Sequence, residues 1–400
     1  MAAEIIKSHF DDSLGGKLSS IKKESNPWSQ PDEFDLSSWA DRHEVDRRID
    51  KGDIKGVEDK VSVVADDLFD MRNPSQTSDG EARSEFVEDI LMQEEKYGHW
   101  FHFRWRDTLV RFPYKEDYQD LRTYRNKHLV TEEEQARLLG SRAAVFGLSV
   151  GSNVVEQLVY SGIGGEIQIG DFDVLTPTNL NRIKASMTDV GEKKLDIVAK
   201  KVSELDPYIR QVHYDEGLTT DVLDQMVEHK PDVIFDEIDD LAMKAALRVF
   251  ARRNNIPIIM ATDIGDTSLI DVERHDIEDV KPFLGRVSEE QLQKILDGEM
   301  SQEERQKIMI KIVGLSNITP RILESAMSID KTLGGLPQLG ATASEGGALS
   351  SVAARELLIG NKLETGRYKV SMRRSLGLQH QVSLRDGMKT VAKFIKSTRK

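Results

Sequence analysis

Short apolar runs alternate with amphipathic stretches over the middle of the chain. The apolar runs have the length and composition of buried strands and lie at 142–147, 166–171, 211–214, 232–235 and 256–260. The stretches between them have helical spacing and lie at 152–160, 194–205, 219–229 and 241–253. Strands that alternate with helices in this way are joined by right-handed crossovers and form a parallel sheet. The pattern therefore predicts an α/β fold with a Rossmann-like, doubly wound, mostly parallel sheet.

The pattern is different on both sides of this region. All four tryptophans lie in the first 105 residues, among charged, helix-like segments and two loop-like stretches. We therefore expect an N-terminal, mainly helical extension at 1–120, the Rossmann domain at 121–285, and a C-terminal α+β portion at 286–400. Further elements are expected as a strand at 267–274, helices within 288–330, a helix at 348–358 after a glycine-rich loop, and a strand at 368–372.

Composition limits the possible classes of protein. The formal net charge of −14 gives little electrostatic attraction for phosphate backbones, so we expect no nucleic-acid partner. No run of about 18 apolar residues occurs, so no membrane contact through a spanning helix is expected. The first residues lack the basic and apolar regions of a signal peptide, and a cytoplasmic location is predicted.

The 400 residues include no cysteine. Disulfides, a cysteine-bound zinc ion and a thiol nucleophile are therefore excluded within this chain, and no zinc is expected.

A candidate phosphate-binding loop follows the first predicted strand. Gly147 and Gly151 flank Ser149 at the expected start of a helix, where glycine lets the backbone approach a phosphate and the helix N-terminus favours negative charge. Asp171 ends the second strand, where an acid can accept hydrogen bonds from ribose hydroxyls. A nicotinamide-dependent dehydrogenase would explain these features equally well.

The residues that follow are more specific. Asp171 and Asp173 form a D-x-D pair, and three further elements come after it at 179–182 (N-L-N-R), 191–194 (G-E-K-K) and 236–239 (D-E-I-D). This order and spacing resembles the ThiF/MoeB-type adenylyltransferases, the superfamily that includes the ubiquitin-activating enzymes. The resemblance extends from about residue 125 to residue 275.

The resemblance implies an ATP- and Mg²⁺-dependent enzyme that activates a carboxylate as an acyl adenylate. Arg182, Lys194 and Asp239 would be catalytic, with Asp239 also binding Mg²⁺. The nucleotide would be bound by Gly147, Ser149, Gly151, Asp171, Asp173 and Asn179. Two cations and one metal-binding acid suit this reaction physically, since its catalysis consists chiefly of positioning and charge neutralisation.

Arg125 lies in a stretch that partly resembles the family's R-Y-x-R-Q element, whose arginine reaches the nucleotide of the partner subunit. The resemblance thus implies a homodimer in which Arg125 is catalytic. An ordinary surface arginine would fit the sequence as well.

The sequence also departs from the family pattern. Ser149 and Val150 stand where two glycines are usual, and Asp240 replaces the usual asparagine. Segments 100–105 and 271–276 resemble a bacterial branch related to ThiF-domain/nitroreductase fusion proteins, to which no reaction is assigned.

Three functions remain open at this stage. The first is an active adenylyltransferase whose acceptor is a carboxylate-bearing small molecule, peptide or protein, acting without a cysteine thioester. The second is a catalytically inactive nucleotide-binding scaffold or partner subunit. The third is an NAD-dependent oxidoreductase, which leaves Asn179, Arg182, Lys194 and Asp239 without a role.

Overall fold

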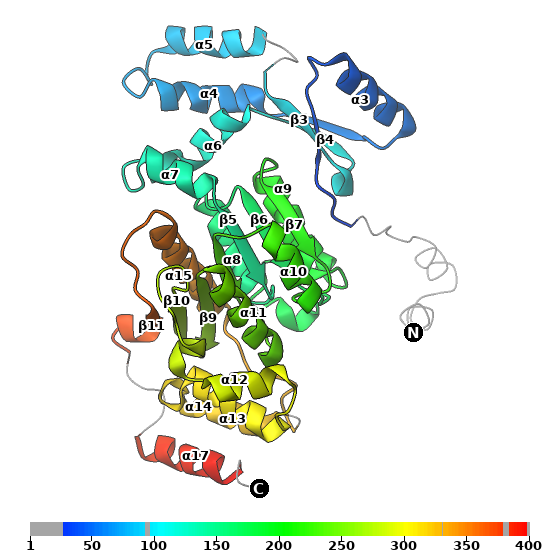
Figure 1. Cartoon of the computed structure of the whole chain (residues 1–400). Coiled ribbons are helices and arrows are strands. Elements are labelled where there is room, and N and C mark those ends of the chain that lie inside the picture. The colour runs from blue at the N-terminus through cyan, green and yellow to red at the C-terminus, as the bar shows by residue number, and fades with distance from the viewer. Residues whose placement is uncertain (1–26, 93–96, 330, 379–383, 398–400) are drawn as a thin grey trace, which may run out of the picture.

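The computed structural model describes residues 27–92, 97–329, 331–378 and 384–397, and its centre is a seven-stranded sheet (Figure 1). The strand order is β11-β10-β9-β8-β5-β6-β7. The strands are β5 (Arg142–Phe146), β6 (Glu166–Gly170), β7 (Arg210–Tyr214), β8 (Val233–Asp236), β9 (Ile258–Ile264), β10 (Thr267–Glu273) and β11 (Gly366–Val370). Strands β5 to β9 pair in parallel, while β10 and β11 are antiparallel to their neighbours. The predicted mostly parallel sheet is confirmed.

The side chains of β5 show how the two faces of the sheet are covered. Ala143 and Val145 belong to one apolar cluster, and Ala144 and Phe146 belong to another, as the alternation of side chains along a strand requires. The first cluster contains residues of α8 (Gly151–Tyr160), α9 (Lys194–Leu205) and α15 (Gly340–Leu358). The second contains residues of α10 (Thr220–Glu228) and α11 (Leu241–Asn254). Helices therefore cover both faces, which makes the sheet doubly wound as predicted.

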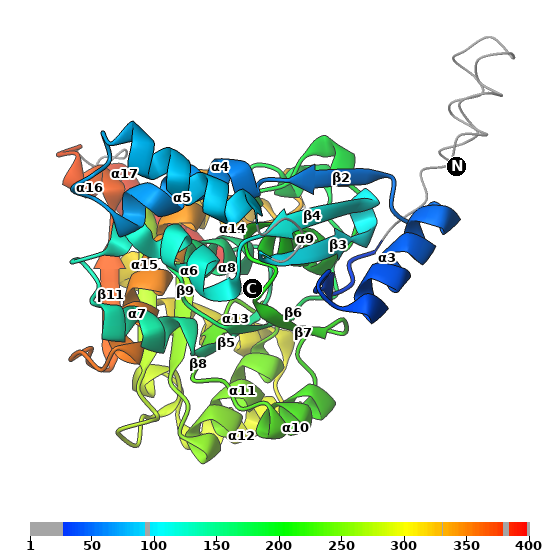
Figure 2. The same cartoon turned by 90° about the horizontal axis from the view of Figure 1, so that it is seen from above.

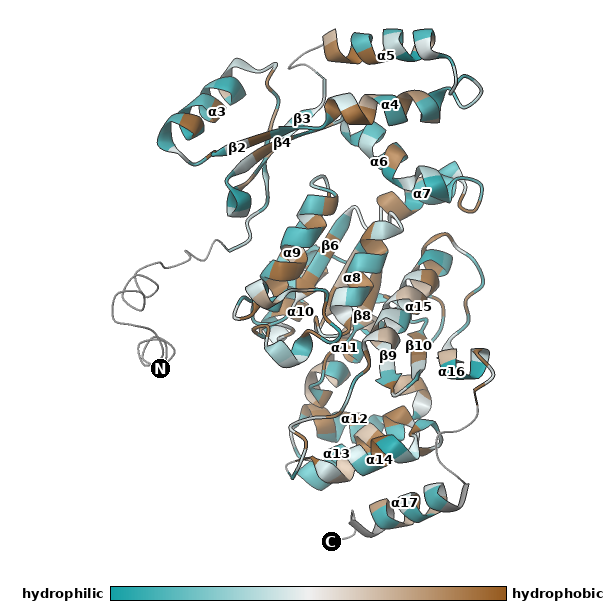
Figure 3. Ribbon diagram, turned by 180° about the vertical axis from the view of Figure 1, so that it is seen from behind, coloured by the Kyte–Doolittle hydropathy of each residue, from teal (hydrophilic) through white to brown (hydrophobic). Residues whose placement is uncertain are grey.

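The helices that cover the sheet carry both hydrophilic and hydrophobic residues, as expected for helices with one face against a core (Figure 3). Shorter elements connect these parts of the fold. They are α6 (Lys115–Thr123), α7 (Glu132–Leu139), α16 (Met372–Ser375), η2 (Arg104–Arg106), η3 (Tyr124–Asn126), η4 (Pro177–Asn179), η5 (Met187–Asp189), η6 (Pro282–Gly285) and η7 (Leu315–Asn317).

The N-terminal region contains a second sheet that the sequence analysis did not predict. Its strand order is β1-β3-β4-β2. The strands are β1 (Asp32–Phe34), β2 (Gly56–Asp59), β3 (His99–Phe103) and β4 (Thr108–Phe112), and the helices are α3 (Trp39–Lys51), α4 (Val61–Arg72) and α5 (Gly80–Met92). Figure 2 shows α3 at one end of this sheet and the α4–α5 pair at the other. Helices are present as expected, but they flank a sheet.

Burial on both faces explains why this sheet was missed. Trp100 in β3 and Leu109 in β4 pack in one apolar cluster, while Phe101, Phe103 and Val110 pack in another. A hairpin with two buried faces shows no alternation of polar and apolar residues, so its period of two is hidden in the sequence.

Two tryptophans attach the N-terminal unit to the Rossmann domain. The indole N–H of Trp28 donates to Ser203 Oγ at 2.9 Å, and that of Trp105 donates to Glu204 at 2.8 Å. Both acceptors lie near the C-terminal end of α9. The N-terminal unit is therefore attached to the helix whose first residue is Lys194.

The C-terminal region adds helices at the other end of the molecule (Figure 1). They are α12 (Glu289–Leu296), α13 (Gln302–Val313), α14 (Pro320–Ser328) and α17 (Leu384–Ser397). Strand β11 also comes from this region, yet it lies in the same sheet as β5. The division of the chain at residues 120 and 285 stays a prediction.

Helix α15 begins earlier than expected, because Gly346 and Gly347 lie inside it and not in a loop before it. A Cβ atom on Gly347 would lie 2.7 Å from the backbone of Asn153 in α8. Glycine is therefore required here by close helix–helix packing, not by a turn. Among the residues that the structure describes, no helix is both long enough and apolar enough to cross a bilayer.

A buried ion network fixes the end of β8. Asp236 accepts hydrogen bonds from Lys244 Nζ at 3.0 Å and from Arg248 Nη1 at 2.6 Å, and Arg248 Nε donates to Glu273 at 2.9 Å. The four side chains are almost fully buried. Burial alone would raise the pKa of Asp236, but Lys244 and Arg248 lower it below its usual value. The network therefore holds a charged carboxylate at the strand end.

Replacing Arg248 by methionine is expected to lower the free energy of unfolding by about 3–5 kcal/mol, because Glu273 then stays buried without its cation. Urea denaturation measures this loss. Arg253→Ala is the control, since Arg253 is exposed on the same helix and should change stability by less than about 0.5 kcal/mol. Equal effects of the two substitutions would contradict the importance of the network.

Candidate active site

The glycine loop lies at the carboxyl end of β5. Gly147 has a φ of 87°, and its N–H donates to the carbonyl of Gly170 at 2.9 Å. A Cβ atom at this position would lie 2.3 Å from the carbonyl oxygen of Glu237. Glycine is thus required both by the backbone angle and by the close approach of the chain after β8. Gly151 begins α8, so the loop places a helix N-terminus at this edge of the sheet.

Asp171 joins the glycine loop to the chain that leaves β6. Its carboxylate accepts from the backbone N–H of Leu148 at 2.6 Å and of Asp173 at 2.7 Å. Burial raises the pKa of Asp171, and these two backbone hydrogen bonds oppose the shift. Asp171 therefore shapes the loop, in addition to the ribose contact that the sequence suggests.

Lys194 lies close to Asp173. The Lys194 ammonium group donates to Asp173 Oδ2 at 2.7 Å, and the Lys194 backbone N–H donates to the Asp173 carbonyl at 3.0 Å. The lysine side chain is 6% exposed, whereas that of Asp173 is 53% exposed. A cation is thus held at the start of α9 by an acid that faces solvent.

Asn179 stabilises its own turn. Its side-chain oxygen accepts from the N–H and the hydroxyl of Thr176, each at 3.0 Å. These contacts shape η4 and thereby set the course of the chain into Arg182.

Arg182 reaches back to the glycine loop. Its Nε donates to Ser149 Oγ at 3.0 Å, and its Nη1 donates to the Thr178 carbonyl at 3.2 Å. Burial lowers the pKa of Arg182, while the nearby charges of Asp239 and Asp263 oppose that effect. Ser149, which stands where glycine is usual, therefore binds one of the proposed catalytic cations.

Asp239 is exposed in the turn between β8 and α11. The neighbouring Asp240 has a separate role, because its side chain caps α11 by accepting from the Met243 N–H at 2.8 Å. No cluster of three or more histidine or acidic side chains that could hold a metal ion occurs among the described residues. A single free carboxylate still suits Mg²⁺, which is commonly held by one or two carboxylates together with substrate phosphates.

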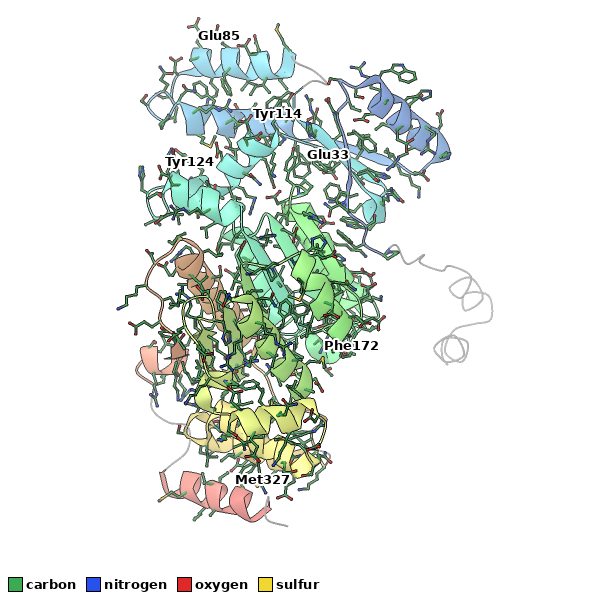
Figure 4. The ribbon with its side chains drawn as sticks, in the orientation of Figure 1. Glu33, Glu85, Tyr114, Tyr124, Phe172 and Met327 are labelled. Atoms are coloured by element: carbon green, nitrogen blue, oxygen red, sulfur yellow. The ribbon has the colours of Figure 1, made fainter. Side chains whose placement is uncertain are left out.

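Arg125 is not part of this group. It is exposed on η3, and Figure 4 shows the adjacent Tyr124 well away from Phe172, which follows Asp171. The structure thus brings together Gly147, Ser149, Gly151, Asp171, Asp173, Asn179, Arg182, Lys194 and Asp239, and leaves Arg125 apart within one chain.

Sequence reasoning missed three residues around Arg182. Asn153 Nδ2 donates to the Arg182 carbonyl at 3.1 Å, the charge of Asp263 acts on Arg182, and Glu345 acts in turn on Asp263. Asp263 is an acid inside an apolar strand, which was a usable signal. Glu345 was assigned to a loop because the start of α15 was placed too late.

Comparisons with known proteins agree with the resemblance. Residues 122–312 match the ThiF family. An uncharacterised protein of Mycobacterium tuberculosis is 32% identical over 287 residues, which cover 72% of this chain and 39% of that protein. The tRNA threonylcarbamoyladenosine dehydratase of Escherichia coli is 33% identical over 32% of this chain and 52% of its own length. The Haemophilus influenzae protein of the same name is 32% identical over 33% of this chain and 51% of its own length.

The chain therefore spans less than two thirds of the length of each of these relatives. Among solved structures, PaaA aligns with a TM-score of 0.46 at 19% identity, covering 64% of this chain and 77% of that chain.

Replacing Gly147 by alanine is expected to destabilise the protein more than the same change at Gly191. Both glycines have positive φ, and that strain should cost about 1 kcal/mol at either site. Only Gly147 also faces a backbone carbonyl, whereas nothing lies within 4 Å of a Cβ on Gly191. The clash should add roughly 1–3 kcal/mol. Thermal unfolding measures the difference, and equal losses would show that the loop accommodates a methyl group.

Proposed function

The chain carries a ThiF-family domain at residues 122–312, and we propose that it uses ATP to convert a carboxylate into an acyl adenylate. The observation that supports this most is the grouping of two cations and one free acid around the glycine loop. Arg182 contacts the loop through Ser149, and Lys194 is linked to it through Asp173 and Asp171. Asp239 lies close enough to Arg182 to affect its pKa.

In the proposed reaction an oxygen of the acceptor carboxylate attacks the α-phosphorus of ATP. A bond forms between these two atoms, and the bond between the α-phosphorus and the oxygen that bridges to the β-phosphate breaks. Pyrophosphate leaves with the electron pair of that bond. Arg182 and Lys194 would offset the negative charge that develops on the phosphates. Asp239 would hold Mg²⁺, which supplies further charge neutralisation when bound.

The absence of cysteine bears on the second step. The acyl group cannot form a thioester within these 400 residues, so we propose that it passes directly to an incoming nucleophile or to another protein. The candidate acceptors are small molecules, peptides and proteins that carry a carboxylate.

The names of the relatives widen the range of acceptors to be tested. Two of those described above are named tRNA threonylcarbamoyladenosine dehydratase, and another relative is named sulfur carrier protein ThiS adenylyltransferase. A net charge of −14 disfavours a large RNA-binding surface here. We therefore favour a non-nucleic-acid acceptor and include tRNA in the acceptor panel.

A homodimer is part of the proposal. Arg125 is exposed and lies apart from the site of its own chain. It would contribute to the reaction if it reached the nucleotide of a partner subunit.

One observation favours the scaffold alternative. Ser149 and Val150 stand where two glycines are usual. The Ser149 hydroxyl accepts a hydrogen bond from Arg182, so this arginine already has a partner in the loop before any nucleotide binds. A scaffold would bind nucleotide through the same fold without turning it over.

ATP with Mg²⁺ is expected to stabilise the protein, because the site offers cations and a free acid to a triphosphate. At about 100 times its dissociation constant, ATP should add ~2.7 kcal/mol of stability, which a thermal-shift assay detects. NAD is the comparison ligand. Stabilisation by NAD and none by ATP would favour the oxidoreductase and exclude the proposed activity.

Arg182→Ala and Asp239→Ala are each expected to lower ATP–pyrophosphate exchange by about 10²–10³, which corresponds to roughly 3–4 kcal/mol of lost charge stabilisation. Exchange is measured with candidate acceptors, and Arg253→Ala serves as an exposed control. ATP binding without exchange for every acceptor, in the unmodified protein, would leave the scaffold as the function.

The same assay examines the dimer. Mixing Arg125→Ala with Asp239→Ala should restore part of the exchange, since a mixed dimer would contain one site with both residues intact. Full activity of Arg125→Ala alone would show that Arg125 has no part in the reaction.

A further inference from the structure

Asp263 lies next to the proposed site but has no part in the reaction described so far. It is near the carboxyl end of β9, directly opposite Ser268 of β10. Helix α15 packs over it so closely that a Cβ atom on Gly346 would lie 3.2 Å from Asp263 Oδ1. The carboxyl group is therefore enclosed between the sheet and α15.

Neither carboxyl oxygen of Asp263 has a hydrogen-bond partner among the described residues, although both are covered from solvent. A buried polar group without a partner is costly, so such a group in a folded protein calls for an explanation. Arg182, the cation whose charge acts on Asp263, does not supply a partner; its Nε donates to Ser149, and its Nη1 donates to Thr178 and Asn181.

Two charged side chains act on Asp263, Glu345 from α15 and Arg182 from the chain after η4. A third acid, Glu237 at the end of β8, has a pKa that burial raises well above its usual value and that the charge of Asp263 raises further. Glu345 itself accepts a hydrogen bond from Ser268 at 2.8 Å. Burial and the charge of Glu345 raise the pKa of Asp263, Arg182 lowers it, and the net pKa is about 7. The group is thus divided between its charged and neutral forms near neutral pH.

A bound nucleotide would change this balance. Its phosphates would neutralise Arg182 and bring several negative charges toward Asp263, and both effects favour the protonated form. A charged carboxylate would repel the phosphates, whereas a neutral carboxylic acid has an O–H group that can donate to them. The arrangement therefore suits an acid that is neutral when the site is filled.

We propose that Asp263 becomes protonated when nucleotide binds, and that its carboxyl group, which is covered in the free protein, is then uncovered and donates a hydrogen bond to a phosphate oxygen. This assignment rests on the proposed function, because it requires the nucleotide phosphates to lie at Arg182. Asp263 is then a nucleotide-binding residue that works as a neutral donor, beside two cations that work by charge.

Calorimetric titration with ATP tests the proposal without any knowledge of the acceptor. Titrations at pH 7.5 in PIPES and in Tris, which differ in ionisation enthalpy, give the number of protons taken up on binding. The unmodified protein should take up more protons than Asp263→Asn, whose side chain cannot titrate. Protonation of ATP itself is common to both proteins and cancels in the comparison.

The pH dependence of affinity has a defined sign. Below the pKa of the free protein, Asp263 is already protonated and affinity should not depend on it. Above about pH 7, each pH unit should weaken ATP binding by up to about tenfold, until the pKa of the complex is passed. Asp263→Asn should lack this dependence and still bind ATP, because an amide also donates a hydrogen bond. Asp263→Ala, which cannot donate a hydrogen bond, should bind ATP more weakly than Asp263→Asn at all pH values.

Two further variants support the comparison. Asp266→Asn, in the turn between β9 and β10, is the control and should behave as the unmodified protein. Glu345→Gln removes a like charge, so the fall in affinity should begin at lower pH, and this remains measurable if Asp263→Asn does not fold. Proton uptake with ATP but not AMP would place the donor at the β- or γ-phosphate, and uptake with both would place it at the α-phosphate.

The contrary results are distinct. Equal proton uptake by the unmodified protein and Asp263→Asn, or weaker ATP binding by Asp263→Asn at pH 6.5, would overturn the role of Asp263 alone. A protein that binds no ATP at all would overturn the proposed function and this inference together.

Discussion

The carboxylate of Asp236, buried with its two cations at the end of β8, is the contact on which the geometry of the site depends. Lys244 and Arg248 come from α11, and Glu273 on β10 binds the far side of Arg248. The network thus joins a strand, a helix and a second strand through side chains that are almost fully buried. A charge buried in this way is tolerated only when its partners are fixed in place.

The residues after Asp236 depend on that anchor. The Glu237 carbonyl lies against Gly147, and the Glu237 carboxyl group accepts from the Ala261 N–H of β9 at 2.8 Å. Asp239 and the helix cap Asp240 follow within the same turn. The segment from Glu237 to Asp240 therefore determines how closely the chain after β8 approaches the glycine loop, how it is bonded to β9, and where the proposed metal ligand lies.

The central fold could be predicted from the sequence because its signals are local. A strand such as β5 is apolar after its first residue, and a helix such as α9 has a regular apolar face, so short windows identify both. The residues that the structure brings together around the loop were identified through motif spacing. The N-terminal sheet could not be found in this way, since its hairpin is buried on both faces.

Other features required the tertiary structure. Gly347 looks like a turn residue in the sequence, and only its contact with Asn153 shows that it belongs to a helix. Asp263 and Glu345 lie far apart in the chain and become neighbours only when α15 packs on the sheet. The contact between Ser149 and Arg182 depends on how η4 turns, which motif spacing does not describe.

The attachment of the N-terminal unit to α9 has a mechanical consequence. Trp28 and Trp105 bind Ser203 and Glu204 near one end of that helix, and Lys194 is the residue at its other end. A helix of twelve residues is about 18 Å long and bends little, so it behaves as a stiff lever. A tilt imposed on the tryptophan end would displace the lysine end as well. A partner that bound the N-terminal unit and tilted it would thus move Lys194 through α9, although the partner would not touch the site itself.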